Sequence, residues 1–546
     1  MLVKDFIAQY FEKLEIQKVF GVSGANIEDL YSAISARKKT SIVLAKNEYN
    51  ASMMAIGSYL SSKKVTAVLT TSGAGVLNTL PILAEGFSSK LPFVLISGIV
   101  PQNLEGLGAF QDTSGSGNTF DLTKVLAPCC QSIRKITSAT EIPAAINEAF
   151  SLANLNKLPV VLLIPKDLFN QECLEDQIII SEIKTTEDIP TGPAEEFLQR
   201  VINSKKSPLV ILGEQLIHEA DLKDVYFFIK NLNASVAVTP TAKGLYDHFD
   251  PDFLGLTGVM GHDRVNEFLK ETDDVIILGS ELDMLSRFSI QKDLTEKNIF
   301  IINNDWSGTS NFELQSENKI ILKGDINKYI SSLSEKFNFH KDFSFPDLTS
   351  KKSMLNDQEF SYKNILASIE NNLPYNADVF VDAGNSGAFA IHNLKPRGEG
   401  IFYVSLGMGG MGNSIGAAIG SCAHSGKKTS VIMGDGSFLM HGLEMHTAIE
   451  HELPLTFFIF NNNSHAMCTT REEIFLDGST ETNNFKQSFL GKGFNDIFPG
   501  LKSFDVNTLA ELTKALESLQ TSKGASIISL NIKDTTQPPF RTFIKS

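Results

Sequence analysis

Short apolar runs rich in β-branched residues recur along the whole chain, and helix-length segments separate them. Eight of these runs are residues 65–71, 91–98, 158–165, 207–213, 273–279, 298–304, 428–434 and 453–462. Near-continuous apolar runs of this length are typical of strands buried on both faces. Helical segments between them predict parallel sheets covered by helices. The pattern therefore predicts an α/β protein.

The chain is too long for a single core, because domains commonly hold about 100 to 200 residues and this one has 546. Two polar stretches, residues 171–195 and 338–358, interrupt the apolar pattern. They divide the chain into predicted domains at 1–170, 190–338 and 355–546. We expect each domain to contain a parallel sheet flanked by helices.

The charge balance excludes several kinds of partner. Lys and Arg number 48 against 63 Asp and Glu, a formal net charge of −15, which argues against binding nucleic acid or an anionic membrane. No apolar run approaches the roughly 18 residues of a membrane span. The five cysteines form no CxxC pair, and their odd number suggests a reducing compartment. We therefore expect a cytoplasmic protein.

Two distant segments resemble each other. Residues 66–98 and residues 429–462 both run through a strand, a Gly-rich turn, a helix, Leu-Pro and a second strand. The match suggests common descent, although two βαβ units can also converge. Ser72 stands where the second copy has Asp435. Only the C-terminal copy therefore carries an acid in its turn.

The Gly-rich segment 407–412 fits GxGxxG, the fingerprint of dinucleotide-binding proteins. Asp435 lies near the place of a ribose-binding acid, so one interpretation is a nicotinamide-dependent dehydrogenase. This motif alone is weak, however, and Asp435 lies between two glycines in a tight turn. Such an acid suits a metal ion beside a phosphate better than it suits a ribose.

Asp435 and Asn462 follow two successive predicted strands. The carboxyl ends of adjacent parallel strands meet at one edge of a sheet, where such sheets bind ligands. The glycines that flank Asp435 let backbone amides approach a diphosphate, and the helix predicted from about Phe438 to His451 directs its positive end towards it. A carboxylate, an amide oxygen and a backbone carbonyl form a ligand set that suits Mg²⁺.

These residues resemble the cofactor motif of thiamine diphosphate-dependent enzymes. The likeness extends to residues 19–34, to Asn47-Glu48, to residues 70–98 and to residues 405–420. The chain is identified as a member of the acetolactate synthase, 2-oxo acid decarboxylase and benzaldehyde lyase group. The resemblance implies a pyrimidine-binding domain, a middle domain similar to transhydrogenase domain III, and a diphosphate-binding domain. It also implies thiamine diphosphate and Mg²⁺ as cofactors.

The resemblance assigns a role to each site residue. Glu48 would hydrogen-bond the pyrimidine ring of the cofactor and so promote loss of the thiazolium C2 proton. Met411 would hold the cofactor in its bent shape, and the Gly409 carbonyl would accept from its amine. Residues that would bind the diphosphate or its metal ion are Gly434, Asp435, Gly436, Ser437, Asn462 and Ser464, with Asp435, Asn462 and the Ser464 carbonyl on the metal. The family builds its sites between subunits, which implies a homodimer or homotetramer.

Less specific matches bear on the two substrates, the donor of the two-carbon unit and its acceptor. Phe110-Gln111 resembles a stretch of acetolactate synthases in which Gln faces the intermediate, and Asn26 is implied to be catalytic with Gln111 and Glu48. Positions implied to line the substrate pocket are Ser23, Gly24, Phe110 and Arg471. An arginine in the pocket would suit an acceptor that carries a carboxylate or phosphate, although Arg471 could equally be a solvated side chain.

The function implied is decarboxylation of a 2-oxo acid, pyruvate first, and transfer of the two-carbon unit to a carbonyl acceptor. The enzyme would be a transferase or lyase. Alternatives are a simple 2-oxo acid decarboxylase, a benzaldehyde lyase-like acyloin lyase, and an inactive family member that serves as a subunit. Residues 255–261 resemble part of the flavin region of acetolactate synthases, but Glu281 and Asp283 replace its basic turn. This replacement argues against FAD.

Overall fold

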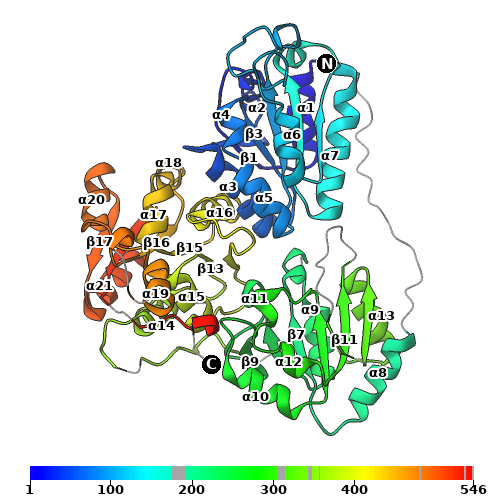
Figure 1. Cartoon of the computed structure of the whole chain (residues 1–546), viewed down its shortest axis with the longest axis vertical. Helices are drawn as coiled ribbons and strands as arrows, with labels where there is room; N and C mark the ends of the chain where they lie inside the picture. Colours follow the sequence, from blue (N-terminus) through cyan, green and yellow to red (C-terminus); the bar gives the residue numbers. More distant parts are fainter. Residues whose placement is uncertain are drawn as a thin grey trace.

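The computed structural model describes the chain except for residues 175–191, 220, 305–313, 317, 342, 344–346, 356, 477, 479–480, 534–535 and 544–546. The described strands form three six-stranded sheets in which all paired strands are parallel. Figure 1 shows three units, with the N-terminal sheet at the top, the middle one at the lower right and the C-terminal one at the lower left. The predicted α/β class with three parallel sheets is confirmed.

The N-terminal sheet has the strand order β2-β1-β3-β4-β6-β5. Its strands are β1 (Lys18–Gly21), β2 (Ser41–Leu44), β3 (Ala67–Thr70), β4 (Val94–Ile99), β5 (Ser132–Lys135) and β6 (Val160–Pro165). Its helices are α1 (Val3–Lys13), α2 (Glu28–Ser35), α3 (Glu48–Ser62), α4 (Ala74–Leu77), α5 (Leu80–Ser88), α6 (Leu122–Leu126) and α7 (Ile142–Asn156).

The middle sheet has the order β12-β11-β10-β7-β8-β9, which is the order of dinucleotide-binding folds. Its strands are β7 (Leu209–Leu212), β8 (Ser235–Val238), β9 (Phe253–Leu256), β10 (Asp274–Leu278), β11 (Asn298–Asn303) and β12 (Lys319–Lys323). Its helices are α8 (Gly192–Asn203), α9 (Lys223–Asn231), α10 (Asp263–Glu271), α11 (Met284–Arg287), α12 (Gln291–Leu294) and α13 (Ile326–Lys336).

The C-terminal sheet has the order β14-β13-β15-β16-β18-β17, and this repeats the order of the N-terminal sheet. Its strands are β13 (Asp378–Val381), β14 (Phe402–Val404), β15 (Thr429–Gly434), β16 (Leu455–Asn461), β17 (Lys502–Val506) and β18 (Ser526–Asn531). Its helices are α14 (Tyr362–Asn372), α15 (Asn385–Asn393), α16 (Asn413–Ser425), α17 (Asp435–His441), α18 (Met445–Glu450), α19 (Ala466–Phe475), α20 (Leu490–Ile497) and α21 (Leu509–Leu519).

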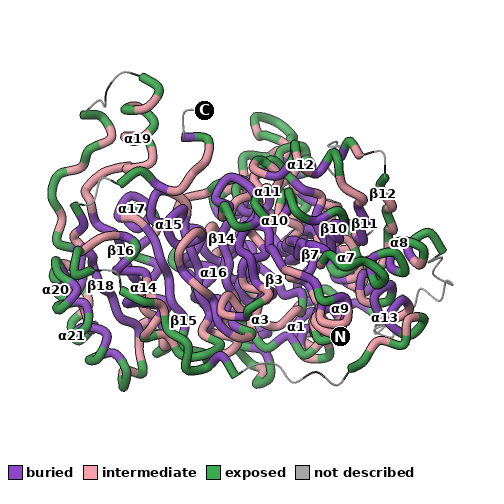
Figure 2. Tube along the Cα trace, turned by 90° about the horizontal axis from the view of Figure 1, so that it is seen from below, coloured by how far each residue is buried: buried purple, intermediate pink, exposed green. Residues whose placement is uncertain are grey.

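The apolar runs of the sequence form strands because the sheets are covered on both faces. Each of the eight predicted runs overlaps a strand, and only β4 extends beyond its run, by one residue. Residues of β4 and β6 are buried throughout, and Figure 2 shows the buried strands inside the layer of more exposed helices. The two segments matched in the sequence correspond to β3–β4 and β15–β16, which occupy the same places in their sheets.

The N-terminal and C-terminal units share one hydrophobic core. A single cluster of buried side chains runs from α1 and β3 to α16 and β15. Helices α3 and α16 lie against each other so closely that a Cβ atom on Gly57 would be 1.8 Å from the Ala417 carbonyl oxygen. Glycine is required at this position because any side chain would push the helices apart.

One helix differs from its prediction. The helix expected from about Phe438 to His451 begins earlier, at Asp435, and the 3-10 turn Gly442–Glu444 divides it into α17 and α18. The first turn therefore includes Asp435 itself. The sequence between two glycines resembled a loop, but the strand β15 leads directly into the helix.

The limits of the predicted domains stay predictions. The predicted linker 171–195 lies mostly outside the described residues. Of the described helices, none is both long and apolar enough to cross a membrane.

Candidate active site

Asp435 lies at the carboxyl end of β15, beside the end of β16. The two strands pair in parallel up to Gly434 and Phe460, so the residues that follow them meet at one edge of the sheet. The Asp435 side chain is buried, and its Oδ1 accepts a hydrogen bond of 3.0 Å from the Gly436 amide. Its Oδ2 is buried and has no hydrogen-bond partner among the described residues. This carboxylate oxygen therefore lacks the partner that a buried charged atom requires.

The turn after β16 brings a second group of oxygen atoms to the same edge. Asn462 Oδ1 accepts from the Ser464 amide at 3.2 Å, while Asn463 adopts a left-handed conformation with φ of 54°. Asparagine tolerates this conformation better than most residues. The resulting turn brings both Asn462 and Ser464 to the cavity that Asp435 lines.

That cavity has a volume of about 220 Å³. It is lined by Tyr362, Ala383, Gly384, Asn385, Ser386, Gly409, Met411, Gly434, Asp435, Gly436, Ser437, Phe460, Asn462, Ser464, His465, Ala466, Met467 and Cys468. All the residues predicted to bind the diphosphate, the metal ion or the Gly-rich side of the cofactor are among them. A Cβ atom on Gly436 would lie 2.7 Å from His465 Nδ1, so this glycine is needed to keep the turn compact.

The donor set fits a hard divalent cation. Burial raises the pKa of Asp435 to about 6, and the neighbouring amides of Gly436, Asn463 and Ser464 offset only part of this effect. A cation at Oδ2 would restore the ionised form. The described residues contain no cluster of three or more His, Cys, Asp or Glu side chains suited to a metal ion. A metal ion held here would therefore depend on amide and carbonyl oxygens beside one carboxylate, as Mg²⁺ sites with bound phosphate do.

The segment between β13 and α15 also reaches the cavity and was not predicted from the sequence. Gly384 has φ of 104°, and a Cβ atom there would have no neighbour within 4 Å, while Asn385 Oδ1 is buried without a hydrogen-bond partner among the described residues. The side-chain nitrogen Nδ2 of Asn385 donates to Thr470 Oγ1 at 3.1 Å. The signal for this segment was Gly-Asn-Ser after a strand, which could have been recognised as a third polar strand end.

Asp382 was also missed, and it supports the Gly-rich turn. Both its carboxylate oxygens accept from the Gly412 amide at 3.0 Å. Its Oδ2 also accepts from the Ser414 hydroxyl at 2.7 Å. Since charge-assisted bonds of this kind are strong, Asp382 holds the turn that carries Met411 at the start of α16.

Glu48 begins α3 on the N-terminal unit. Asn47 caps the helix by accepting from the Asn50 amide at 2.8 Å. The Glu48 side chain is buried, and its Oε2 accepts from Asn78 Nδ2 at 3.0 Å. Its Oε1 would lie 3.0 Å from a Cβ atom on Gly75. This oxygen accepts no hydrogen bond from the described residues.

Gln111 and Asn26 lie beside the turn after β3. Gln111 adopts φ of 62°, and its Oε1 accepts from Thr71 Oγ1 at 3.5 Å. The side-chain nitrogen Nδ2 of Asn26 donates to Ser72 Oγ at 2.8 Å. Contacts to the same turn therefore bring Asn26 and Gln111 near each other, and Gly75 of that turn also touches Glu48.

Comparison with known families covers most of the chain. The family described as thiamine pyrophosphate enzyme, N-terminal TPP binding domain, matches residues 1–118. The central domain of the same enzymes matches residues 196–333, and the C-terminal TPP binding domain matches residues 382–530. The chain belongs to the thiamine pyrophosphate enzymes. Thiamine pyrophosphate is thiamine diphosphate, so the expected family is confirmed.

Individual relatives of this enzyme support the same group. It is 25% identical to the mitochondrial acetolactate synthase catalytic subunit of Saccharomyces cerevisiae, over 96% of this chain and 80% of that protein. It is 23% identical to pyruvate decarboxylase of Neurospora crassa, over 97% and 93%. The solved 4-hydroxybenzoylformate decarboxylase of Rhodococcus jostii superposes with a TM-score of 0.80 at 17% identity, over 98% and 100%. That likeness shows the shared fold.

The four residues implied to line the substrate pocket lie on two units of a single chain, with Ser23, Gly24 and Phe110 on the N-terminal unit and Arg471 on the C-terminal one. Gly24 packs against Thr71, where a Cβ atom would be 2.7 Å from the Thr71 Cβ. Ser23 is exposed, and Phe110 is 82% exposed. Arg471 lies on α19 with its guanidinium over the Phe475 ring, and the cavity is lined by earlier residues of that helix. Their place in a substrate pocket stays a prediction.

The two halves of the predicted site do not share a cavity within one chain. The described lining of the Asp435 cavity comes entirely from residues 362–468. Glu48, Asn26 and Gln111 contact residues of the N-terminal unit instead. A single chain therefore contains one N-terminal cluster and one C-terminal cavity.

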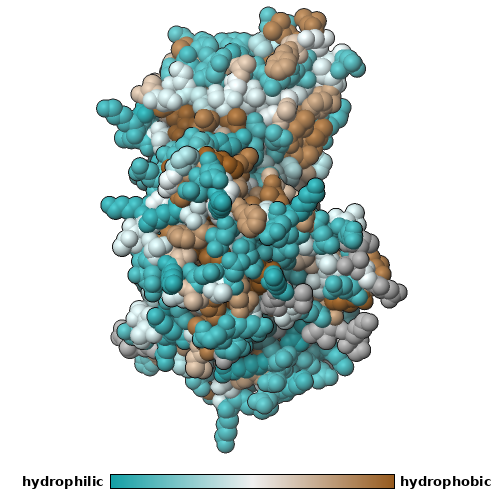
Figure 3. All heavy atoms as spheres, turned by 90° about the vertical axis from the view of Figure 1, so that its left-hand side faces the viewer, coloured by the Kyte–Doolittle hydropathy of each residue, from teal (hydrophilic) through white to brown (hydrophobic). Residues whose placement is uncertain are grey.

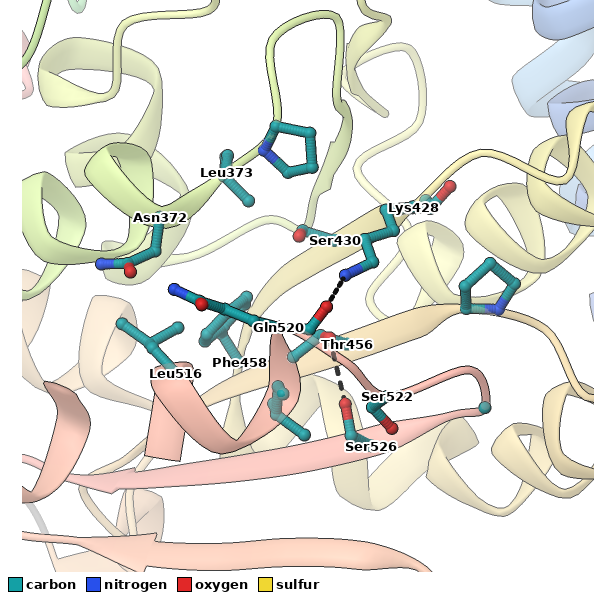
Figure 4. A pocket seen from close by; sticks show the side chains of 15 residues that line it. Asn372, Leu373, Lys428, Ser430, Thr456, Phe458, Leu516, Gln520, Ser522 and Ser526 are labelled. Carbon is teal, nitrogen blue, oxygen red and sulfur yellow. Dashed lines mark hydrogen bonds between the residues drawn. The ribbon is translucent and has the colours of Figure 1, made fainter. Parts of the chain in front are cut away.

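Another cavity, of about 260 Å³, lies at the opposite edge of the C-terminal sheet (Figure 4). Thr456 and Ser526 pair through their hydroxyls at 3.0 Å, and Lys428 Nζ donates to the Gln520 carbonyl at 2.6 Å. The described lining contains no carboxylate. This cavity is at the amino ends of the strands, away from Asp435, and we do not assign the cofactor to it.

The middle sheet has an acidic group where its strand order reverses, between β7 and β10. Glu214 follows β7, and its carboxylate accepts from the Ser280 hydroxyl at 3.0 Å and the Glu281 amide at 3.2 Å. Burial raises the pKa of Glu214 to about 7. Dinucleotides bind at such a reversal in other folds. Here the hydroxyl and amide donors beside the strand ends are already bound to a protein carboxylate.

Proposed function

We propose that the enzyme binds thiamine diphosphate through Mg²⁺ and decarboxylates a 2-oxo acid, pyruvate first. It would then transfer the two-carbon unit to a carbonyl acceptor, as an acetolactate synthase does. The observation that carries this proposal is the buried, unpartnered Oδ2 of Asp435 in a cavity that Asn462 and Ser464 also line. The yeast acetolactate synthase subunit among its relatives supports the same reaction class.

Each part of the chain would contribute a separate step. Asp435 Oδ2, Asn462 Oδ1 and the Ser464 carbonyl would hold the metal ion and, through it, the diphosphate. When bound, thiamine diphosphate supplies the carbon nucleophile and the electron sink for loss of carbon dioxide. Glu48 Oε1 would hold a proton for the pyrimidine ring. Gln111 and Asn26 would direct their amides at the substrate carboxylate or carbonyl.

The active enzyme would be at least a homodimer, with a homotetramer as the larger assembly. Because the C-terminal cavity lacks Glu48, a second copy must supply the N-terminal cluster. Exposed apolar side chains beside the cavity suit such a contact, including Leu439, Met440 and Leu443 at 53 to 62% exposure and Met408 at 59%. Apolar patches also interrupt the hydrophilic surface in Figure 3.

A simple decarboxylase is the second candidate. The Neurospora crassa relative is named a pyruvate decarboxylase, and the Rhodococcus jostii neighbour is named a decarboxylase. A benzaldehyde lyase-like acyloin lyase belongs to the same group. These reactions differ in whether free aldehyde or a coupled product leaves the site. We propose no FAD, because Glu214 and Glu281 bring two acids to the strand reversal of the middle sheet.

Product analysis tests the proposal. The enzyme is incubated with thiamine diphosphate, Mg²⁺ and pyruvate, candidate acceptors are added, and products are identified by mass. We expect carbon dioxide and a coupled acyloin or acetohydroxy acid. Free aldehyde as the sole product would favour the simple decarboxylase. No cofactor-dependent consumption of any 2-oxo acid would favour an inactive subunit.

Two variants connect the reaction to the site. Asp435→Asn should abolish the Mg²⁺-dependent part of thiamine diphosphate binding, measured by calorimetry with and without a chelator. Asp505→Asn is a matched control, since both Asp505 oxygens accept from backbone amides, at 3.1 Å from Gly491 and 2.8 Å from Lys492. The metal assignment would be wrong if Asp435→Asn bound cofactor with unchanged Mg²⁺ dependence.

A further inference from the structure

Two buried glutamates connect the N-terminal and C-terminal units, and each contacts the loop of the other unit that leads to a site residue. We propose that Glu85 and Glu444 are reciprocal positioning residues: each anchors the opposite loop through backbone amides and thereby orients Met411 or Glu48. This inference rests on the proposed roles of Glu48, Gly409 and Met411. Figure 1 shows the meeting of the two units at α3, α5 and α16.

Glu85 anchors the Gly-rich loop after β14. It lies on α5 and its side chain is completely buried. One oxygen accepts from the Gly407 amide at 3.2 Å, and the other accepts from the Met408 amide at 2.7 Å. Ser89, the residue that caps the C-terminal end of this helix, donates from its hydroxyl to Glu85 at 2.7 Å. The loop continues directly into Gly409 and Met411 of the cofactor cavity.

The approach of this loop to α5 requires glycine. A Cβ atom on Gly407 would lie 2.3 Å from Ser89 Oγ and 3.0 Å from Glu85 Oε1. The chain therefore has a glycine where the backbone must come within hydrogen-bonding distance of the carboxylate. The same glycine was part of the dinucleotide-like pattern in the sequence, and this contact explains its presence.

Glu444 anchors the loop after β2. It ends the 3-10 turn Gly442–Glu444 and is 1% exposed. Both its oxygens accept from the Lys46 amide, at 3.0 and 3.1 Å, and Thr447 Oγ1 donates to it at 2.8 Å. Lys46 is two residues before Glu48. This carboxylate of the C-terminal unit thus fixes the backbone that leads into α3.

The two contacts are related by the repeated fold. Strand β2 with α3 occupies the same place in the N-terminal sheet as β14 with α16 in the C-terminal sheet. The starts of the two helices also meet, since Tyr49 Oη donates to Asn413 Oδ1 at 2.5 Å. Each of these two equivalent loops is therefore bound by a glutamate from the other terminal unit of the same chain. Buried carboxylates need such bonds, because an unpaired buried charge costs several kcal/mol.

The geometry distinguishes the two acids. Glu85 uses one oxygen for each of two amides, so Glu85→Gln places an NH₂ group against one of these amides. Glu444 uses both oxygens for a single amide, so the remaining oxygen in Glu444→Gln can keep that bond. Loss of one charge-assisted bond corresponds to about a tenfold change in a local equilibrium. Glu85→Gln should therefore have the larger effect.

Amide hydrogen exchange of the chain without cofactor gives a readout that does not depend on activity. We expect exchange in residues 405–412 to rise about tenfold in Glu85→Gln. Glu444→Gln should change exchange in residues 44–50 by less, whereas Glu444→Ala should raise it at least as much. Should Glu85→Gln fail to fold, Glu85→Asp keeps the charge but withdraws it by one methylene, and the same rise is expected.

A second readout measures the site itself. At saturating thiamine diphosphate and Mg²⁺, exchange of the cofactor C2 proton should fall about tenfold in Glu85→Gln. One control should leave both readouts unchanged. Glu450→Gln removes the ion pair with Lys46 Nζ but not the contact between Glu444 and the Lys46 backbone amide.

The outcomes separate this inference from the proposed function. The anchoring role of Glu85 would be wrong if folded Glu85→Gln showed unchanged amide exchange, or exchanged the C2 proton as fast as the native enzyme. The proposed role of Glu48 would still stand in that case, provided that Glu48→Gln abolished C2 exchange. If Glu48→Gln also exchanged C2 at the native rate, the proposed role of Glu48 would be wrong instead. Larger effects in Glu444→Gln than in Glu85→Gln would also contradict the geometry.

Discussion

The contact between α3 and α16 predicts a large effect from adding one methyl group. In Gly57→Ala the new Cβ would lie 1.8 Å from the Ala417 carbonyl oxygen and 2.6 Å from its carbon, against about 3.4 Å for an ordinary contact. Both atoms belong to the backbone, so no flexible side chain can move away. The two helices must separate, and this opens the shared core of the terminal units.

The expected cost follows from two opposing terms. Alanine favours a helix over glycine by about 1 kcal/mol. Overpacking of a core costs about 1 to 3 kcal/mol, and a backbone-to-backbone clash belongs at the upper end of that range. The net effect should be a loss of about 2 kcal/mol, or roughly 4 to 8 °C in melting temperature for a unit of this size.

Gly493→Ala is the matched control. Gly493 lies within α20, and a Cβ atom there would have no neighbour within 4 Å. This variant should gain up to about 1 kcal/mol from helix propensity alone. Both variants are compared by thermal unfolding at one protein concentration, since assembly affects the midpoint. A Gly57→Ala protein as stable as the native enzyme would show that α3 and α16 accommodate the extra methyl group without separating.

Three further predictions follow from single side chains. Burial raises the pKa of Glu214 to about 7 from 4.5, so the folded chain holds an extra proton between these values and stability falls as pH rises through them. Glu214→Gln should remove this dependence of the free energy of unfolding on pH, which is measured by urea unfolding at pH 5 and pH 8. The assignment would be wrong if the native enzyme and the variant lost the same stability between the two pH values. Asn47→Ala should cost about 1 kcal/mol because it removes the cap on Asn50, whereas Asn47→Asp should not; equal melting temperatures would exclude the cap. Asp382→Asn should cost about 2 kcal/mol, because its NH₂ group would face the amide of either Ala383 or Ser414, each of which is bound by only one Asp382 oxygen, and an unchanged thermal midpoint would argue against these bonds.

The spacing of neighbouring residues was enough to predict which polar side chains lie at the ends of two strands. Asp435 and Asn462 were predicted together because a strand, a helix and a second strand separate them, and parallel strands end at one edge. Asn385 lies at a third strand end of the same sheet but was missed. Its strand β13 begins with Asp378 and is followed by Asp382, so the apolar run between them is only three residues long.

The positioning acids could not be predicted in this way. Glu85 and Glu444 each lie on a helical segment whose sequence suggests an ordinary solvated glutamate. Their partners are more than 300 residues away in the chain, at Gly407 and Lys46. Whether such a glutamate is buried, and which distant residue it contacts, depends on how the two domains pack. The periodicity of the sequence does not specify this packing.

The amino-acid sequence was enough to predict the sheet-and-helix architecture, the family and the meeting of Asp435 and Asn462 at the ends of β15 and β16. These features depend on neighbouring residues, whose spacing specifies strand, turn and helix. The packing of α3 against α16 and the contacts of Glu85 and Glu444 with the opposite terminal unit became apparent only in the folded chain. Such relations depend on the packing of complete elements, which brings together backbone atoms far apart along the chain.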